Sequence, residues 1–175
     1  MKKKDIFELD FIIDRLTESI VNALSGDSFL TEITLLKRED LFQLTNKSKW
    51  KFNWKIDYND IAKEVYKLTI VGSPNVIQGL ISISIKANYV EMNLLESAPH
   101  NIGINKVYEC VAGNLVAYAC KISFQKGFEG YVAFYAKNQL IEHYKKTLGA
   151  YHFKDQRMFI EEDASRKLVE KYFKV

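Results

Sequence analysis

A run of small and aliphatic residues, "CVAGNLV" at positions 110–116, is the part of this sequence that most directly suggests a binding site. It opens a long apolar stretch that predicts a helix ending near Gln125. The first amides of a helix have no intrahelical partner and lie at the positive end of its dipole, so phosphate groups bind there readily. Ala112 and Gly113 would let an anion approach the backbone closely, and Lys106 would add positive charge. The alternative is that these small residues only allow close helix packing.

Three side chains elsewhere have the chemistry for proton transfer. Tyr144 lies in a predicted helix, whereas Glu91 and Glu96 lie in a predicted strand, "YVEMNLLE". A phenol can donate a proton to a leaving group, and a carboxylate can accept one from a nucleophile through water. In a regular strand Glu96 shares the side of the apolar residues and Glu91 does not, so Glu96 is the first choice as base and Glu91 the second. A core or rim aromatic is the alternative for Tyr144, and a solvated strand residue is the favoured alternative for either carboxylate.

The histidines and cysteines predict no metal site. His100, His143 and His152 lack metal-ligand spacing, and Cys110 and Cys120 lack the paired short gaps of a zinc site. In one helix, with a rise of about 1.5 Å per residue, the two cysteines lie beyond disulfide reach, which indicates a reducing, cytoplasmic setting. Cys110 beside a helix N-terminus could act as a nucleophile, but without a placed histidine a small buried residue is the favoured interpretation.

Size and composition indicate one globular domain over residues 1–175. With 47% hydrophobic residues the chain can bury a core, and it is too short to divide comfortably in two. The apolar residues near its start are interrupted by Glu8, Asp10 and Asp14, which predicts neither an export signal nor a transmembrane helix. We therefore expect no membrane partner.

Hydrophobic patterns predict a mixed α/β (α+β) fold. Helices are predicted over about 10–25, 108–125, 138–148 and 163–173. Strands are predicted over 28–36, at the end of 59–71, and over 77–86, 89–96, 131–136, 150–153 and 157–160. Three successive strands before Pro99 form an antiparallel meander, whereas the strands 89–96 and 131–136 are joined by a crossover helix and are parallel. The predicted sheet is mostly antiparallel, with a central parallel pair and flanking helices.

This order of elements, with three stretches of residues, resembles the GNAT superfamily of N-acetyltransferases, which transfer an acetyl group from acetyl-CoA to an amine. The resemblance covers roughly residues 28–161. "NLLESAP" is similar to the fourth strand of that fold, "CVAGNLV" to its phosphate turn, and "NQLIEHYKKTLGAYHF" to the helix and turn near the thiol.

The resemblance implies how acetyl-CoA would be bound. Backbone groups near Leu95 and Ser97 would hold the pantetheine arm, and the start of the following helix would hold the pyrophosphate. The residues implied in cofactor binding are Leu95, Ser97, Lys106, Cys110, Val111, Ala112, Gly113, Asn114 and Asn138. Tyr144 would protonate the departing thiolate, and Glu96 would take the proton of the amine. Transfer would be direct, without a covalent enzyme intermediate.

The phosphate turn departs from the family pattern. Val107 stands where the family prefers Arg or Gln, and Cys110 replaces the first glycine. The loop from Pro99 to Tyr108 is also longer than usual. Alternative phosphate contacts in this loop are Asn101, Gly103, Asn105 and Lys106. A second frame of the motif, starting at His100, ranks behind the first because it would make the helix too long.

The segment 37–60 has no clear pattern. Its stretch "KSKWKFNWK" places Trp50, Phe52 and Trp54 between lysines, as base-stacking surfaces do. The net charge of +3, from 25 basic and 22 acidic residues, nevertheless argues against nucleic acid as a partner. We rank cover of the sheet edge first for these aromatics, a wall of the acceptor pocket second and nucleic-acid binding last.

Together these features predict a cytoplasmic, acetyl-CoA-dependent N-acetyltransferase that acts on an amine of a small molecule or a protein, without a metal. The alternative is a GNAT-fold protein that binds acyl-CoA or another ligand without turnover, as the altered phosphate turn would allow. The helices over 10–25 and 163–173 lie outside the family pattern. Their apolar faces could pack on the sheet or pair two subunits in a homodimer.

Overall fold

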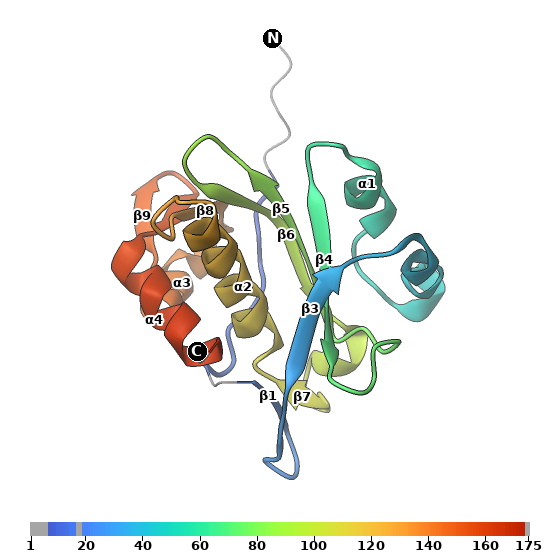
Figure 1. Ribbon diagram of the computed structural model, residues 1–175. Coiled ribbons are helices and arrows are strands. Elements are labelled where there is room, and N and C mark those ends of the chain that lie inside the picture. Colours follow the sequence, from blue (N-terminus) through green and yellow to red (C-terminus); the bar gives the residue numbers. More distant parts are fainter. Residues whose placement is uncertain (1–6, 17–18, 174–175) are drawn as a thin grey trace.

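The computed structural model describes residues 7–16 and 19–173 and shows a seven-stranded sheet with helices on both of its faces (Figure 1). The strands are β1 (Ile20–Asn22), β2 (Ser28–Phe29), β3 (Thr31–Leu35), β4 (Glu64–Ile70), β5 (Gly79–Ile85), β6 (Val90–Ser97), β7 (Tyr108–Glu109), β8 (Val132–Tyr135), β9 (Tyr151–Lys154) and β10 (Arg157–Ile160). The α-helices are α1 (Trp54–Asn59), α2 (Val111–Gln125), α3 (Ile141–Leu148) and α4 (Glu162–Tyr172). Short 3-10 helices are η1 (Arg38–Gln43), η2 (Asn46–Ser48), η3 (Pro99–Asn101) and η4 (Asn138–Leu140).

The main sheet has the strand order β3-β4-β5-β6-β8-β10-β9. Its neighbouring strands pair antiparallel except β6 and β8, which are parallel. The predicted meander, the central parallel pair and the mixed α/β class are thereby confirmed. A second, three-stranded sheet of β2, β1 and β7 was not predicted, because strands of two or three residues carry no readable period.

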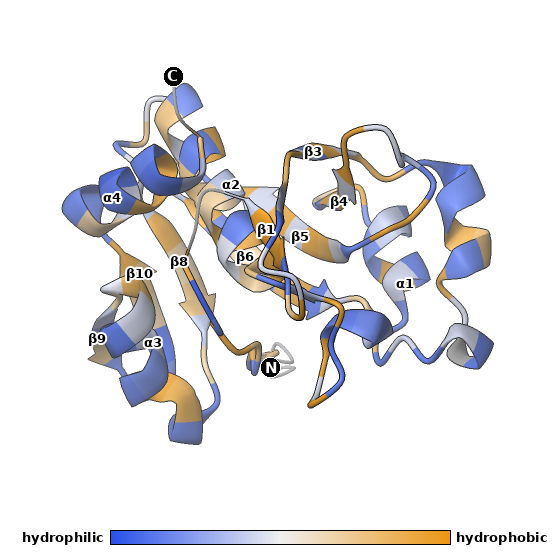
Figure 2. Ribbon diagram, turned by 90° about the horizontal axis from the view of Figure 1, so that it is seen from below, coloured by the Kyte–Doolittle hydropathy of each residue, from blue (hydrophilic) through white to orange (hydrophobic). Residues whose placement is uncertain are grey.

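Helix α2 covers one face of the main sheet and packs against both β6 and α4. A Cβ atom on Gly79 of β5 would lie 2.6 Å from Cγ1 of Val111, so the glycine allows the helix to approach the strand closely. Apolar residues are concentrated in the central strands and α2, whereas α4 is mainly hydrophilic on its outer side (Figure 2). The predicted helix over 163–173 corresponds to α4 and is confirmed.

The segment 37–60 covers part of the opposite face of the sheet. Trp54 is fully buried, and its Nε1 donates a hydrogen bond to Glu96 of β6. Lys67 of β4 forms a buried ion pair with Asp40 of η1 at 2.9 Å. Trp50 is also buried. Trp54 therefore contacts the central strand β6 and not the edge of the sheet that our first interpretation gave for the aromatics.

The parallel pair of β6 and β8 is short. The two strands are in register only at Val90 with Val132 and at Glu91 with Ala133. Beyond these pairs β6 continues beside β5 to Ser97, whereas β8 pairs with β10. The gap between the diverging strands is where the candidate site lies.

The predicted helix over 10–25 is wrong for the residues that the structure describes. Residues 9–16 are extended and run through the gap between β6 and β8 (Figure 1), and Ile20–Asn22 form β1. Leu9, Phe11 and Ile13 are buried while Ile12 is 56% exposed, which is the alternation of a strand. The same residues fit both a helical spacing and an alternation of period two. In the folded chain they follow the alternation, because they lie extended in the gap of the sheet.

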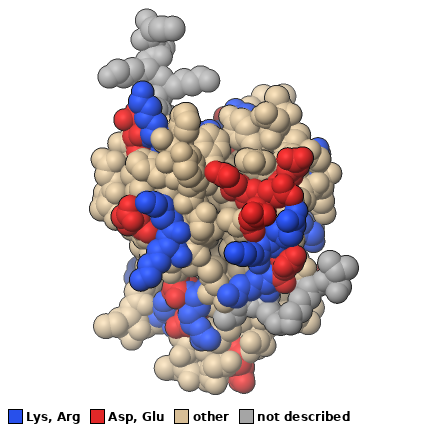
Figure 3. All heavy atoms as spheres, turned by 90° about the vertical axis from the view of Figure 1, so that its left-hand side faces the viewer, with Lys and Arg blue, Asp and Glu red and all other residues tan. Residues whose placement is uncertain are grey.

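Charges of both signs lie in mixed groups on the face seen in Figure 3. This distribution agrees with the small net charge and gives no single-sign surface on that face.

Candidate active site

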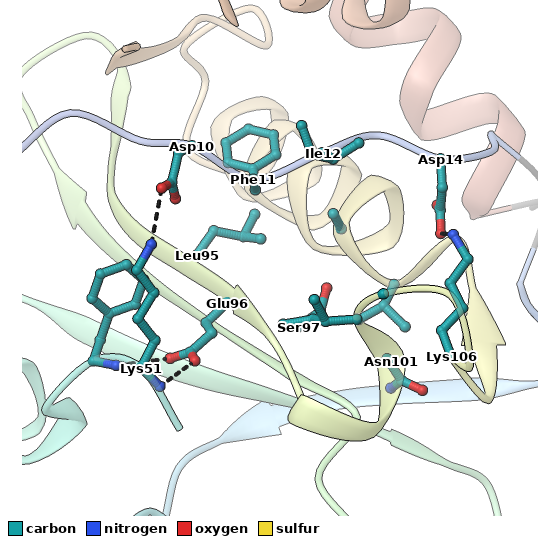
Figure 4. A pocket seen from close by; sticks show the side chains of 15 residues that line it. Asp10, Phe11, Ile12, Asp14, Lys51, Leu95, Glu96, Ser97, Asn101 and Lys106 are labelled. Carbon is teal, nitrogen blue, oxygen red and sulfur yellow. Dashed lines mark hydrogen bonds and ion pairs between the residues drawn. The ribbon is translucent and has the colours of Figure 1, made fainter. Parts of the chain in front are cut away.

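A cavity of about 450 Å³ lies between the end of β6 and the extended segment 9–16 (Figure 4). The end of β6, the loop after η3 and the start of α2 form one side. The other side is formed by Asp10, Phe11, Ile12 and Asp14 of the extended segment. Lys51 and Phe52 close one end. The cavity thus joins parts of the chain that are far apart in sequence.

The structure brings several predicted cofactor-binding residues together. Leu95 and Ser97 of β6 line the cavity with Lys106, Val111 and Ala112. The other predicted cofactor residues do not line it: Cys110, Gly113 and Asn114 are buried behind this wall, and Asn138 is exposed in η4. Lys51 and Phe52 of the aromatic segment also belong to the wall, whereas Trp50 and Trp54 do not line the cavity.

The start of α2 already has an anionic partner. The N–H of Cys110 donates a hydrogen bond to Oδ1 of Asp14 at 3.0 Å, and Nζ of Lys106 lies 2.9 Å from Oδ2 of the same carboxylate. Cys110 has a φ of 74°, a left-handed conformation that glycine adopts more easily. This conformation accounts for the glycine that the resemblance implies at position 110.

Gly113 has a packing role. A Cβ atom on it would clash with the hydroxyl oxygen of Tyr172 in α4 and lie 3.0 Å from the ring carbon that carries this hydroxyl. The amide nitrogen of Asn114 donates to the carbonyl of Cys110 at 3.0 Å. For Gly113 and Asn114 the structure therefore supports the alternative in which this stretch allows close packing and shapes the first turn.

Tyr144 is fully buried in α3 and faces the extended segment. Its hydroxyl donates to the carbonyl oxygen of Phe11 at 2.6 Å, and the centroids of the two rings are 4.6 Å apart. Burial and the negative charge of Asp10 raise the pKa of Tyr144 well above its ordinary value, so the phenol keeps its proton.

His143, the residue before Tyr144, also contacts the segment. Its Nε2 accepts a hydrogen bond from the backbone N–H of Ile13 at 2.9 Å. Burial lowers the pKa of His143 below its ordinary value, which favours the neutral ring that this acceptor role requires.

Glu96 holds the aromatic segment in place. Its carboxylate accepts hydrogen bonds from the N–H of Lys51 at 2.7 Å, from the N–H of Phe52 at 3.3 Å and from Nε1 of Trp54 at 2.8 Å. It is 5% exposed and lines the cavity.

Glu91 does not line the cavity. It forms a two-fold hydrogen-bonded ion pair with Arg157 of β10, at 2.6 and 2.8 Å. The structure thus places the second candidate base away from the cavity wall.

Asp10 sits between two lysines at the closed end. Its Oδ2 lies 2.9 Å from Nζ of Lys51 and 2.8 Å from Nζ of Lys137. Partial burial alone would raise the pKa of Asp10, but the hydrogen bonds and charges of the two lysines outweigh it and lower the pKa below its ordinary value.

Sequence reasoning missed the contribution of Asp10, Phe11, Asp14 and His143. The alternation of buried Leu9, Phe11 and Ile13 was the signal that could have revealed an extended segment. Nothing in the sequence indicated which gap it fills.

Within residues 7–16 and 19–173, no group of three or more His, Cys, Asp or Glu side chains has the arrangement of a metal site. Among the same residues, no helix is both long and apolar enough to span a membrane.

No protein-family model matches the sequence, and no curated protein matches it. Solved structures do match. A chimera of the spermidine N-acetyltransferase from Vibrio cholerae and hSSAT gives a TM-score of 0.55 at 16% identity, over 78% of this chain and 98% of that chain. The Vibrio cholerae spermidine N-acetyltransferase in complex with CoA and spermine gives 0.53 at 15% identity, with the same coverage. The chain has the GNAT N-acetyltransferase fold.

The GNAT fold predicted from the residues is thereby confirmed. A dodecameric structure of the Vibrio cholerae enzyme also matches, with a TM-score of 0.51 and 16% identity over 76% of this chain and 94% of that chain. At such identities the likeness concerns the fold, and the chemistry of the cavity has to be argued from its own residues.

Proposed function

We propose that this protein is an acetyl-CoA-dependent N-acetyltransferase that moves an acetyl group directly to a primary amine of a small molecule or a protein. The observation that carries the proposal is the cavity beside the end of β6, beyond the point where β6 and β8 separate. It is lined by the end of β6, by the first turn of α2 and by Lys106, in a GNAT fold.

The donors at the start of α2 fit an oxyanion. The carboxylate of Asp14 is such a group, and it accepts from the N–H of Cys110 and pairs with Lys106. We propose that the pyrophosphate of acetyl-CoA takes these donors, aided by the dipole of α2. Leu95 and Ser97 would present backbone groups to the pantetheine arm.

We propose Tyr144 as the acid. The amine nitrogen forms a bond to the acetyl carbon while the carbon–sulfur bond breaks, and Tyr144 gives its proton to the sulfur. An ordinary tyrosine has a pKa of about 10, so the phenol is protonated at neutral pH until the thiolate forms. The amine releases one proton to a base, and an equivalent proton returns to the phenolate through solvent, so that no net proton is lost by the protein.

Glu96 is our proposed acceptor of that amine proton, through water. A carboxylate has about four acceptor positions, and the aromatic segment occupies three of those of Glu96. The remaining position can take one water on the cavity side, because Glu96 lines the cavity.

A second candidate function is acyl-CoA or ligand binding without turnover. The hydroxyl of Tyr144 and the N–H of Cys110 both already donate to the segment 9–16. A protein that keeps the fold but does not catalyse the reaction would tolerate having these two donors bonded to its own chain.

Calorimetric titration with acetyl-CoA, with free CoA and adenosine diphosphate as controls, tests the cofactor. We expect a micromolar dissociation constant, about −8 kcal/mol. Spermine and spermidine are the first acceptors to assay, because one structural neighbour was crystallised with CoA and spermine.

Tyr144→Phe separates the two functions. If the protein is an enzyme, the variant should lose at least about 100-fold in turnover without losing affinity for acetyl-CoA. Tyr151→Phe, at a tyrosine that is 54% exposed on β9, is the matched control. Turnover of Tyr144→Phe at the parent rate would refute the assignment of the acid.

The homodimer stays a prediction. β9 is an edge strand of the main sheet, and Tyr151 and Phe153 on it are 54% and 63% exposed. Light scattering distinguishes a 20.3 kDa monomer from a particle of twice that mass or more.

A further inference from the structure

We propose that residues 9–16, here called the strap, are an autoinhibitory segment that occupies the acetyl-CoA cleft and must leave it before the cofactor binds. The proposal rests on the proposed function. It concerns the same cleft but adds a competitor that belongs to the chain itself (Figure 4).

At one end the strap takes the free edge of β8. The N–H of Leu9 donates to the carbonyl of Tyr135 at 2.7 Å, and the N–H of Lys137 donates to the carbonyl of Leu9 at 3.0 Å. Leu9 forms a parallel bridge with Ala136 and is 2% exposed. The strap therefore stands beside β8 at the level where β6 has left it.

In its middle the strap engages the proposed acid. The carbonyl of Phe11 accepts a hydrogen bond from the hydroxyl of Tyr144 at 2.6 Å, and the N–H of Ile13 donates to His143 at 2.9 Å. The proton that Tyr144 would give to a leaving thiolate is thus committed to a backbone oxygen. An enzyme in this state cannot use Tyr144 as an acid.

At its other end the strap supplies an anion to α2. The carboxylate of Asp14 takes the N–H of Cys110 and the ammonium of Lys106, which are the donors proposed for the pyrophosphate. A carboxylate and a phosphate oxygen need the same donors and carry the same sign of charge. Both cannot be bound there together.

The strap has both buried and partly exposed contacts. Leu9, Phe11 and Ile13 are buried, whereas Ile12 is 56% exposed and the side chains of Asp14 and Lys106 are 22% and 26% exposed. Opening therefore exposes three apolar side chains, which keeps the open form a minor state. If the strap were open in about 1% of molecules, the apparent affinity for acetyl-CoA would fall about 100-fold.

Hydrogen exchange of the full chain, with and without saturating free CoA, tests whether the strap moves. The amides of Leu9 and Ile13 report on the strap, and those of β5 serve as a reference. We expect CoA to speed exchange of the two strap amides about 10-fold or more while the reference amides do not change. A strap that forms a fixed wall would show unchanged or slower exchange when CoA binds, which overturns the proposal.

Variants that weaken the strap give a second measurement. Leu9→Ala and Asp14→Asn should each bind free CoA about 10-fold more tightly than the parent chain, by calorimetry. The matched controls are Leu24→Ala and Asp27→Asn, both exposed in the β1–β2 region, and they should bind as the parent does. Leu9→Ala carries no change of charge, so its effect cannot come from reduced repulsion of phosphate.

The outcomes separate the two proposals. Tighter binding by both variants than by the parent, with faster exchange of the strap amides, supports the strap proposal. Equal binding by parent and variants, with unchanged hydrogen exchange, overturns the strap proposal but does not contradict the proposed function. No binding by any of the chains overturns both. If Leu9→Ala does not fold, hydrogen exchange of the parent chain still decides the strap proposal, because that measurement needs no variant.

Discussion

The carboxylate of Asp14 accepts a hydrogen bond from the backbone N–H of Cys110, 96 positions later in the chain, at 3.0 Å. The side chain of Cys110 does not cap α2, so this distant carboxylate supplies the anionic partner that a helix N-terminus favours. The contact joins the strap to the helix that opens the candidate cofactor site. Asp14 therefore stabilises the form in which the strap is bound. In our proposal it competes with the pyrophosphate of acetyl-CoA for the same donors.

Glu96→Ala should lower the free energy of unfolding by about 2–4 kcal/mol, because it leaves three donors of the aromatic segment without their charged acceptor. Urea denaturation measures the loss. Glu32→Ala, at an exposed position of β3, should change stability by less than about 1 kcal/mol. A loss of that small size for Glu96→Ala would mean that water replaces the carboxylate without cost.

Asp10 should make stability depend on pH in the acid range. The pKa of Asp10 is lowered in the folded chain from a reference value of 3.8, so its contribution is fully present above about pH 3.8. It is lost as the pH falls through the lower folded pKa.

Denaturation of the parent and of Asp10→Asn between pH 7 and pH 2 checks this prediction. The parent should be the more stable protein at pH 7, and the difference should shrink as the solution is acidified. Asp27→Asn, which changes an exposed carboxyl group, is the control. A difference that grew on acidification would contradict the lowered pKa.

Gly113→Ala should destabilise the protein, although alanine ordinarily favours a helix over glycine by about 1 kcal/mol. The added methyl group would clash with the hydroxyl of Tyr172, which packs α4 on α2. Overpacking of this kind costs about 1–3 kcal/mol.

Pairing the substitution with Tyr172→Phe should recover part of the loss, because the nearest clashing atom is then removed. Thermal unfolding of the two single variants and the double variant gives the coupling between the sites. Additive losses would show that the methyl group and the hydroxyl do not meet.

The sequence by itself determined the central architecture. Three patterns each favoured one type of element: the alternation over 77–86, the buried run 131–136 and the helical spacing of 163–173. The structure has β5, β8 and α4 there. The crossover connection required the parallel pair of β6 and β8, and with it the closeness of Leu95 to Ala112 across one cavity. These inferences held because period and connectivity are local properties of the chain.

Only the tertiary structure decided what fills the cleft. Residues 9–16 fit both a helix and an extended strand, and local spacing cannot choose between them. The extended form is stabilised by the free edge of β8, the hydroxyl of Tyr144 and the N–H of Cys110 just before α2, all more than 90 positions away. The edge of β8 and the hydroxyl of Tyr144 bond to backbone groups of Leu9 and Phe11, and the N–H of Cys110 bonds to the carboxylate of Asp14. These distant contacts override the local pattern.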